Sequence, residues 1–156
     1  RRQRRVCIRD SDGGDGLVCE DTVYVGWSTR TNHQGLKERA HRLLPHGYRV
    51  KAVEVTGGLH LKSAMTLVAP GLVLANPALA NLKRVGGVEL LEVDPLEPAA
   101  ANALMIAGSV VYPEEFPRTA SLLVDRNIDL QTVPTRELQK AEAGVTCRSV
   151  HWRGAS

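Results

Sequence analysis

The stretch TVYVGWS, residues 22–28, decides the fold class because its apolar side chains occupy every second position. The side chains of Val23, Val25 and Trp27 would share one face of a half-buried β-strand. Another strand is expected just before this one. Leucine and alanine then recur at a helical spacing over residues 34–44, and residues 49–55 return to a strand pattern. The order strand–strand–helix–strand is therefore predicted.

The same order recurs twice further along the chain. In the second copy, strand, strand, helix and strand are expected at residues 64–68, 72–76, 77–85 and 88–93. In the third copy they are expected at residues 103–107, 109–112, 117–125 and 128–133. A period of about 40 residues is typical of a propeller or an array of similar units. The sequence thus predicts an α/β fold of three ββαβ units, and a single α/β sandwich with one mixed sheet is the alternative.

Two short elements are expected after the third unit. Thr135 would cap a helix that runs to Lys140. The closing stretch GVTCRSV, residues 144–150, alternates like a strand that passes through Cys147. Cys147 would then lie between a small-residue turn and a strand.

Composition and charge are those of an ordinary soluble globular protein. The chain has 156 residues, enough for one domain, of which 43% are hydrophobic and 24% are charged. Its apolar runs are far shorter than the roughly 18 residues of a transmembrane helix, so no membrane span is expected. The net charge of +3 is concentrated at the start, and residues 6–156 sum to −1. We interpret residues 1–9 as a basic tail and expect no nucleic-acid binding.

Cysteine usage and the first residue bear on compartment and completeness. Cys7, Cys19 and Cys147 are too widely spaced for a disulfide framework or a zinc site, so reduced thiols and a cytoplasmic location are predicted. The chain begins with Arg, and its only methionines are Met65 and Met105. We therefore expect that residues upstream were removed or that the sequence is partial.

The acidic stretch DSDGGDG, residues 10–16, does not fit a calcium loop. Its sixth position is Asp15, where an EF-hand requires glycine, and its twelfth is Asp21, where an EF-hand has glutamate. We expect a tight turn that exposes acid side chains, Asp12 among them, just before a strand. An ordinary Asp-Gly turn without function is the alternative.

Three further side chains are candidates for chemistry. Arg30, between a strand and a helix, could form a forked contact with a carboxylate, although a solvated arginine is the simpler reading. His60 follows a turn at Gly57-Gly58 that enters an apolar strand, where a half-buried histidine is more often structural. Cys147 could be a nucleophile or an inert cysteine. A cysteine with a distant histidine and acid is the general layout for nucleophilic catalysis, provided the fold brings them together.

Several of these stretches resemble the dimethylarginine dimethylaminohydrolases, within the guanidino-modifying superfamily. The similar segments are DGGD (12–15), TRTN (29–32), LHLKS (59–63), PGLV (70–73), NA (102–103), PEEFP (113–117) and TCRS (146–149). They occur in the family's order and spacing from about residue 10 onward. Lys62, two places after the histidine, is similar to the dimethylarginine branch, whereas arginine deiminases carry an aspartate there.

The resemblance implies a five-bladed α/β propeller (pentein) of ββαβ units around a central substrate channel. This chain would hold about three of the five units, so a partial propeller is expected. Residues 10–156 would form a single guanidino-modifying catalytic domain without the family's N-terminal units. The acidic motif with which those units bind the guanidinium nitrogens has no counterpart here.

The resemblance also implies a cysteine-dependent hydrolase that converts dimethylarginine to citrulline and dimethylamine through a covalent thiouronium intermediate. Cys147 would attack the guanidinium carbon as a thiolate. His60 would protonate the leaving amine and then activate water. Asp12, where many relatives carry glutamate, would pair with His60 or with the guanidinium.

Three residues would hold the substrate: Arg30 on its α-carboxylate, the backbone of Ala141 and the side chain of Glu142. No metal or organic cofactor is implied, and the expected partner is a small guanidino compound, with a homodimer possible. Two other functions stay open. One is an arginine deiminase or amidinotransferase, and the other is an inactive truncated product that keeps the catalytic residues without turnover.

Overall fold

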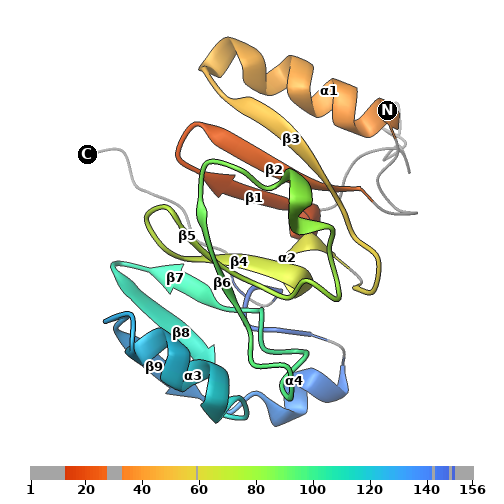
Figure 1. The fold of residues 1–156 in the computed structure, drawn as a ribbon. Helices are drawn as coiled ribbons and strands as arrows, with labels where there is room; N and C mark the ends of the chain where they lie inside the picture. Colours follow the sequence, from red (N-terminus) through yellow and green to blue (C-terminus); the bar gives the residue numbers. More distant parts are fainter. Residues whose placement is uncertain (1–12, 28–32, 59, 142, 148, 150–156) are drawn as a thin grey trace, which may run out of the picture.

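Each sheet of the protein combines one antiparallel and one parallel strand pair. The computed structural model (Figure 1) describes residues 13–27, 33–58, 60–141, 143–147 and 149. Within them lie three three-stranded sheets, in the orders β1-β2-β3, β4-β5-β6 and β7-β8-β9. In every sheet the first two strands are antiparallel and the last two are parallel. The predicted α/β fold of three units is confirmed, and the alternative of one mixed sheet is wrong.

The first unit follows the prediction closely. Its elements are the 3₁₀ turn η1 (Gly13–Asp15), β1 (Gly16–Cys19), β2 (Thr22–Trp27), α1 (His33–Leu43), η2 (Leu44–His46) and β3 (Arg49–Glu54). The strand β2 is not half-buried as expected, because residues 22–26 are all buried. It is the central strand of its sheet and contacts both α1 and the next unit, so neither face is left to solvent.

The second unit differs from the prediction at its crossover. Its elements are α2 (Leu61–Ala64), β4 (Met65–Ala69), β5 (Leu72–Ala75), η3 (Leu82–Arg84) and β6 (Glu89–Glu92). The helix expected over residues 77–85 is only the 3₁₀ turn η3. The physical reason is that this backbone bonds to the end of β3: Asn81 N donates to Glu54 O over 2.8 Å, and Thr56 N to Leu79 O over 2.9 Å.

The third unit is completed by a carboxylate from the linker before it. Its elements are β7 (Leu104–Ile106), β8 (Ser109–Pro113), α3 (Pro117–Val124) and β9 (Leu130–Val133), followed by α4 (Arg136–Lys140). Glu97 accepts the backbone N–H groups of Arg118 and Thr119 at the start of α3, over 2.9 and 2.8 Å. These donors have no partner inside the helix, so Glu97 satisfies two of them and also complements the helix dipole.

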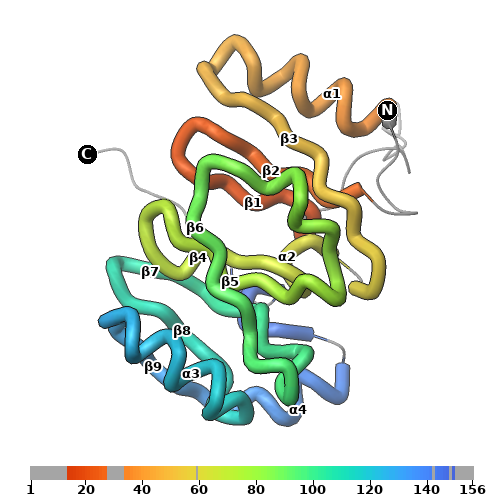
Figure 2. Tube along the Cα trace, viewed as in Figure 1, coloured from red at the N-terminus to blue at the C-terminus, as the bar shows by residue number. Residues whose placement is uncertain are grey.

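Two hydrophobic clusters hold the units together, and β5 contributes to both. Val73 and Ala75 pack into the cluster shared with the first unit, while Leu72 and Leu74 pack into the cluster shared with the third. The alternation of side chains along a strand explains this division. Figure 2 shows the result, in which the second unit lies between the first and the third. Among the described helices, none is long and apolar enough to cross a membrane.

Candidate active site

The described residues include three of the six predicted site residues. His60 precedes α2, Ala141 follows α4, and Cys147 lies in the closing segment. Asp12, Arg30 and Glu142 lie outside the described residues. The described part of the candidate site therefore consists of the segments around His60 and Cys147.

His60 lies at the start of a one-turn helix. Its backbone is extended, with φ −142° and ψ 161°, and its carbonyl accepts the N–H of Ser63 over 3.0 Å. The strand expected over residues 64–68 follows this helical turn and begins at Met65. The imidazole is half-buried, as predicted, and packs against the backbone of Gly14. A Cβ atom at residue 14 would lie 2.8 Å from Cγ of the ring.

Asp15 fixes the start of the same helix from the first unit. Its carboxylate is fully buried, and Oδ1 accepts the backbone N–H of Leu61 over 3.1 Å. The prediction of an exposed acidic turn is therefore wrong for Asp15. A backbone donor in the first turn of a helix needs an acceptor, and a carboxylate supplies it with favourable charge. The acidic segment and the histidine segment consequently pack against each other.

Cys147 lies in a turn and not in the strand expected from the sequence. Its backbone N–H donates to the carbonyl of Gly144 over 3.1 Å, which closes a turn over residues 144–147. The thiol is exposed, whereas Val145 is buried and anchors the turn. Ala141, at the end of α4, is exposed and donates its N–H to Leu138 O over 3.0 Å.

The side chain of Asn102 connects the histidine segment to the cysteine turn. Its Nδ2 donates to the carbonyl of Lys62 and to Oγ1 of Thr146, both over 2.8 Å. Its Oδ1 accepts the N–H of Thr146 over 3.2 Å. Reasoning from residue chemistry missed this role, although a single amide inside the otherwise apolar run at residues 99–106 was a usable signal.

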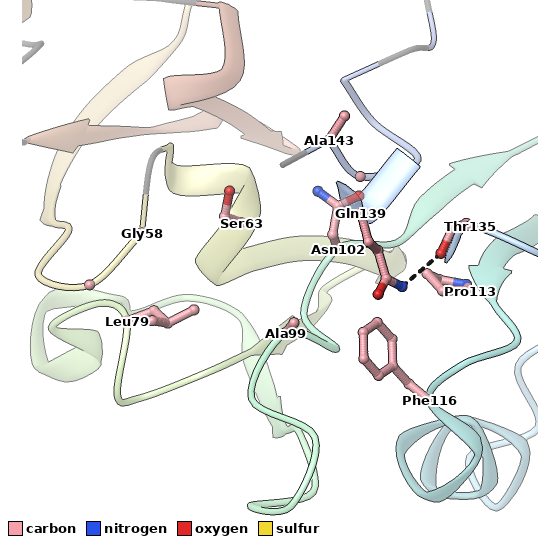
Figure 3. A pocket seen from close by; sticks show the side chains of 12 residues that line it. Gly58, Ser63, Leu79, Ala99, Asn102, Pro113, Phe116, Thr135, Gln139 and Ala143 are labelled. Carbon is pink, nitrogen blue, oxygen red and sulfur yellow. Dashed lines mark hydrogen bonds between the residues drawn. The ribbon is translucent and has the colours of Figure 1, made fainter. Parts of the chain in front are cut away.

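A pocket of about 400 Å³ lies beside this connection (Figure 3). Its lining includes the side chains of Leu79, Ala99, Phe116 and Gln139, together with Asn102. Neither His60 nor Cys147 lines it. Asn102 therefore borders the pocket and also bonds to the cysteine turn.

The second described cysteine lacks the properties of a nucleophile. Burial, with a smaller contribution from the carboxylate of Glu20, raises the pKa of Cys19 to about 11. A thiol with so high a pKa is almost entirely protonated near neutral pH, and the protonated form is unreactive. Of the two described cysteines, only Cys147 is exposed. In the part of the chain that the structure describes, no three His, Cys, Asp or Glu side chains are grouped to hold a metal ion.

The carboxylate of Glu115 holds the residue before α4. Its two oxygens accept the N–H and the hydroxyl of Thr135, each over 2.8 Å. Desolvation acts to raise the pKa of Glu115, but the bonds from Thr135 and the backbone outweigh it, so this pKa lies below its ordinary value. The contact fixes the start of the segment that leads to Ala141 and Cys147.

No family model matches the chain. Among curated proteins it is 37% identical over 143 residues to the N(G),N(G)-dimethylarginine dimethylaminohydrolase of Streptomyces coelicolor, covering 91% of this chain and 54% of that protein. It is 27% identical over 141 residues to the enzyme of the same name from Pseudomonas aeruginosa, covering 90% of this chain and 56% of that protein. The chain thus spans about half the length of these relatives.

Solved structures agree with this relationship. A Pseudomonas aeruginosa dimethylarginine dimethylaminohydrolase, a cysteine-to-serine mutant complexed with citrulline, matches with a TM-score of 0.75 at 27% identity, over 86% of this chain and 52% of that one. A dimethylarginine dimethylaminohydrolase with a histidine-to-glycine substitution was solved as an adduct with S-methyl-L-thiocitrulline. It matches with a TM-score of 0.78 at 27% identity, over 86% of this chain and 53% of that one. An amidinotransferase of the Microseira wollei saxitoxin pathway, at 20% identity and a TM-score of 0.79, shares the fold.

The three units, each built on a three-stranded sheet, therefore have a partial propeller-like α/β fold, which they share with solved dimethylarginine dimethylaminohydrolases. Within that fold class, the chain is a relative of the dimethylarginine dimethylaminohydrolases over about half of their length. The resemblance predicted from the sequence is confirmed.

Proposed function

We propose that this chain carries the nucleophile and the proton-transfer group of a hydrolase that converts dimethylarginine to citrulline and dimethylamine. The observation that carries the proposal is the hydrogen-bonded connection from the segment of His60 through Asn102 to the turn of Cys147. It brings together two segments that lie far apart in the sequence. The relatives named dimethylarginine dimethylaminohydrolase supply the substrate class.

The proposed reaction has two halves that use the same two side chains. In the first, the Cys147 thiolate bonds to the guanidinium carbon, His60 donates a proton to the dimethylamine nitrogen, and the C–N bond breaks. This leaves a thiouronium adduct on sulfur. In the second, His60 removes a proton from water, the hydroxide attacks the same carbon, and the C–S bond breaks to release citrulline. One water is consumed and one dimethylamine is formed in each turnover.

The remaining predicted site residues enter as parts of this proposal. Asp12 would pair with His60 or with the guanidinium, and its position two residues before Gly14, which packs on the imidazole, supports this. Arg30, which follows β2, would bind the substrate α-carboxylate. Ala141 and Glu142 would contact the substrate between α4 and the cysteine turn.

Further parts of the proposal concern the protein as a whole. Residues 10–156 form one catalytic domain whose partner is a small guanidino compound. The widely spaced cysteines suit a reducing, cytoplasmic compartment. A homodimer is compatible with this arrangement, and size-exclusion chromatography with light scattering would measure the oligomeric state.

The test is citrulline release by the chain from dimethylarginine, with arginine alone and arginine plus glycine as alternative substrates. We expect citrulline from dimethylarginine, and a loss of at least about a thousandfold in Cys147→Ser. Cys19→Ser is the matched control and should retain the activity. Citrulline mainly from arginine would indicate a deiminase, and transfer to glycine an amidinotransferase. No turnover in any of the three assays would contradict the proposal and favour an inactive truncated protein.

A further inference from the structure

We propose that Asn102 is a positioning residue that fixes the turn bearing Cys147 against the segment bearing His60. The inference rests on the proposed function for the roles of those two residues. Asn102 itself need not contact the substrate. It acts through the backbone and hydroxyl groups that it holds.

The hydrogen-bonding capacity of the amide matches its surroundings. Both hydrogens of Nδ2 are used, one on the carbonyl of Lys62 and one on the hydroxyl of Thr146, while Oδ1 accepts the N–H of Thr146. A side chain of this size that offers two donors and an acceptor from one planar group is asparagine. Since Asn102 is only 8% exposed, water would not readily replace these bonds.

The backbone of the cysteine turn also approaches the side chain of Asn102 closely. A Cβ atom at Gly144 would lie 2.3 Å from Oδ1 and 2.4 Å from Cγ of Asn102. Asn102 could withdraw from such an atom only by giving up its three hydrogen bonds. The cysteine turn therefore lies flat against the amide because residue 144 has no side chain.

The backbone around Asn102 is itself held on both sides. The hydroxyl of Thr66 donates to Ala101 O over 2.7 Å and accepts the N–H of Ala103 over 3.1 Å. The hydroxyl of Tyr112 donates to Ala100 O over 2.8 Å. All of these residues are buried. Asn102 thus projects from a rigid base, which is what a residue needs in order to set the position of another.

This rigidity matters because the thiol of Cys147 is exposed on a short turn. Nucleophilic attack and proton transfer require the reacting groups to be placed to within a fraction of an ångström, and a misplacement of about 1 Å can lower the rate about a hundredfold. Apart from burial of Val145, the described contacts that tie this turn to other segments centre on Asn102.

The main test is Asn102→Asp, which separates the two ends of the connection. A carboxylate can still accept the N–H of Thr146, and the Thr146 hydroxyl, which now accepts from Nδ2, can turn to donate to it. The carboxylate has no hydrogen for the carbonyl of Lys62. We expect kcat for citrulline release to fall about a hundredfold while KM changes less than about threefold. Hydrogen exchange of residues 143–149 should become faster, and exchange in the sheets should not change.

The matched control is Asn76→Asp. Asn76 is also buried, and it likewise donates Nδ2 to a backbone carbonyl, that of Pro98, over 2.6 Å and accepts a backbone N–H, that of Ala78, over 2.8 Å. The control therefore places the same carboxylate against a carbonyl at a site that does not contact the cysteine turn. We expect its kcat to stay within about threefold of the wild type. Equal losses of kcat in both variants would overturn the inference.

A second pair of variants keeps Asn102 intact. Thr146→Val removes the hydroxyl that accepts from Nδ2 and should lower kcat about tenfold. Thr146→Ser restores that hydroxyl and should recover most of the lost kcat. Failure of serine to recover kcat would count against the connection, because the two variants differ in the group that Asn102 binds.

The inference and the proposed function can fail separately. If the wild-type chain releases no citrulline, the proposed function is contradicted, and the exchange measurement alone decides the inference. Faster exchange of residues 143–149 in Asn102→Asp, but not in Asn76→Asp, would then support it. Unchanged exchange in Asn102→Asp would overturn it. If citrulline is released and Asn102→Asp keeps the wild-type kcat, the proposed function stands and the positioning role is wrong.

Discussion

The imidazole of His60 rests on the backbone of Gly14, so closely that a Cβ atom at residue 14 would lie 2.8 Å from Cγ of the ring. The next residue of each segment is also paired, because Asp15 accepts the N–H of Leu61. The acidic segment at the start of the first unit therefore sets both the ring position and the helix that follows it.

Gly14→Ala should displace His60 and reduce turnover. Its Cβ would meet the ring atoms Cγ and Cδ2 at 2.8 and 3.0 Å, so the imidazole must shift, and we expect kcat to fall at least about tenfold. Gly16→Ala is the control, since its Cβ would meet Nη1 of Arg39, the end of a flexible side chain, at 2.7 Å. Citrulline assays and melting temperatures of both variants measure this. Equal losses of kcat would show that the ring contact is not decisive.

Asp15→Ala should destabilise the protein, because it leaves the buried N–H of Leu61 without the oxygen that it now bonds. We expect a loss of about 1–3 kcal/mol in the free energy of unfolding, measured in urea. Asp15→Asn retains an oxygen at the same place and should lose less. An alanine variant as stable as the wild type would mean that the N–H finds another acceptor.

The two described cysteines should differ sharply in alkylation. At pH 8, a thiol with a pKa of about 11 has roughly one molecule in a thousand ionised, so Cys19 should stay unlabelled by iodoacetamide. The exposed Cys147 should be labelled. Peptide mass spectrometry of a Cys7→Ser variant distinguishes the two sites. Preferential labelling of Cys19 in the folded chain would contradict its buried position.

The contact between Glu115 and Thr135 should make stability depend on pH. Because the folded pKa of Glu115 is lowered, the stabilisation is fully present above the ordinary value of 4.5 and is lost as the pH falls through the folded value. Glu115→Gln should therefore lower stability at pH 7, by about 1 kcal/mol. The difference from the wild type should shrink as the pH falls below 4.5.

The control for this prediction is the exposed neighbour Glu114. Glu114→Gln should change the free energy of unfolding by less than about 0.5 kcal/mol at either pH, as is usual for surface substitutions. Thermal unfolding at pH 7 and pH 3.5 provides the comparison. A Glu115→Gln deficit that is the same at both values would show that ionisation of this carboxylate does not contribute.

The repeating fold could be predicted from sequence because its signals are local. Alternation over residues 22–28 and the helical spacing over residues 34–44 each reflect a single element, and β2 and α1 formed where these patterns lay. The segment at residues 77–85 was misread because its backbone bonds to a strand of the preceding unit. Backbone hydrogen bonds between units do not produce a periodic spacing of apolar residues in the sequence.

The candidate site could be predicted only in part, because some of its contacts join residues that lie far apart in the sequence. His60 and Cys147 were predicted as site residues from residue chemistry and resemblance. Their roles stay predictions, as do those of Asp12, Arg30, Ala141 and Glu142. The strand expected through Cys147 is a turn, because the N–H of Thr146 bonds to the Asn102 side chain. A contact between residues 44 positions apart depends on the whole fold, so composition and spacing could not reveal it.

The carboxylate of Glu97, which lies outside the third sheet, holds the first turn of α3. The boundary between modules therefore does not fall at the first residue of a sheet. Suppose that the third unit were grafted onto another protein from Leu104 onward. Its helix α3 would then lose the two Glu97 oxygens that accept its first N–H groups, and the Tyr112 hydroxyl would lose the Ala100 carbonyl. A transferable third unit must therefore start no later than Glu97, and the chain that joins two blades is bonded to both of them.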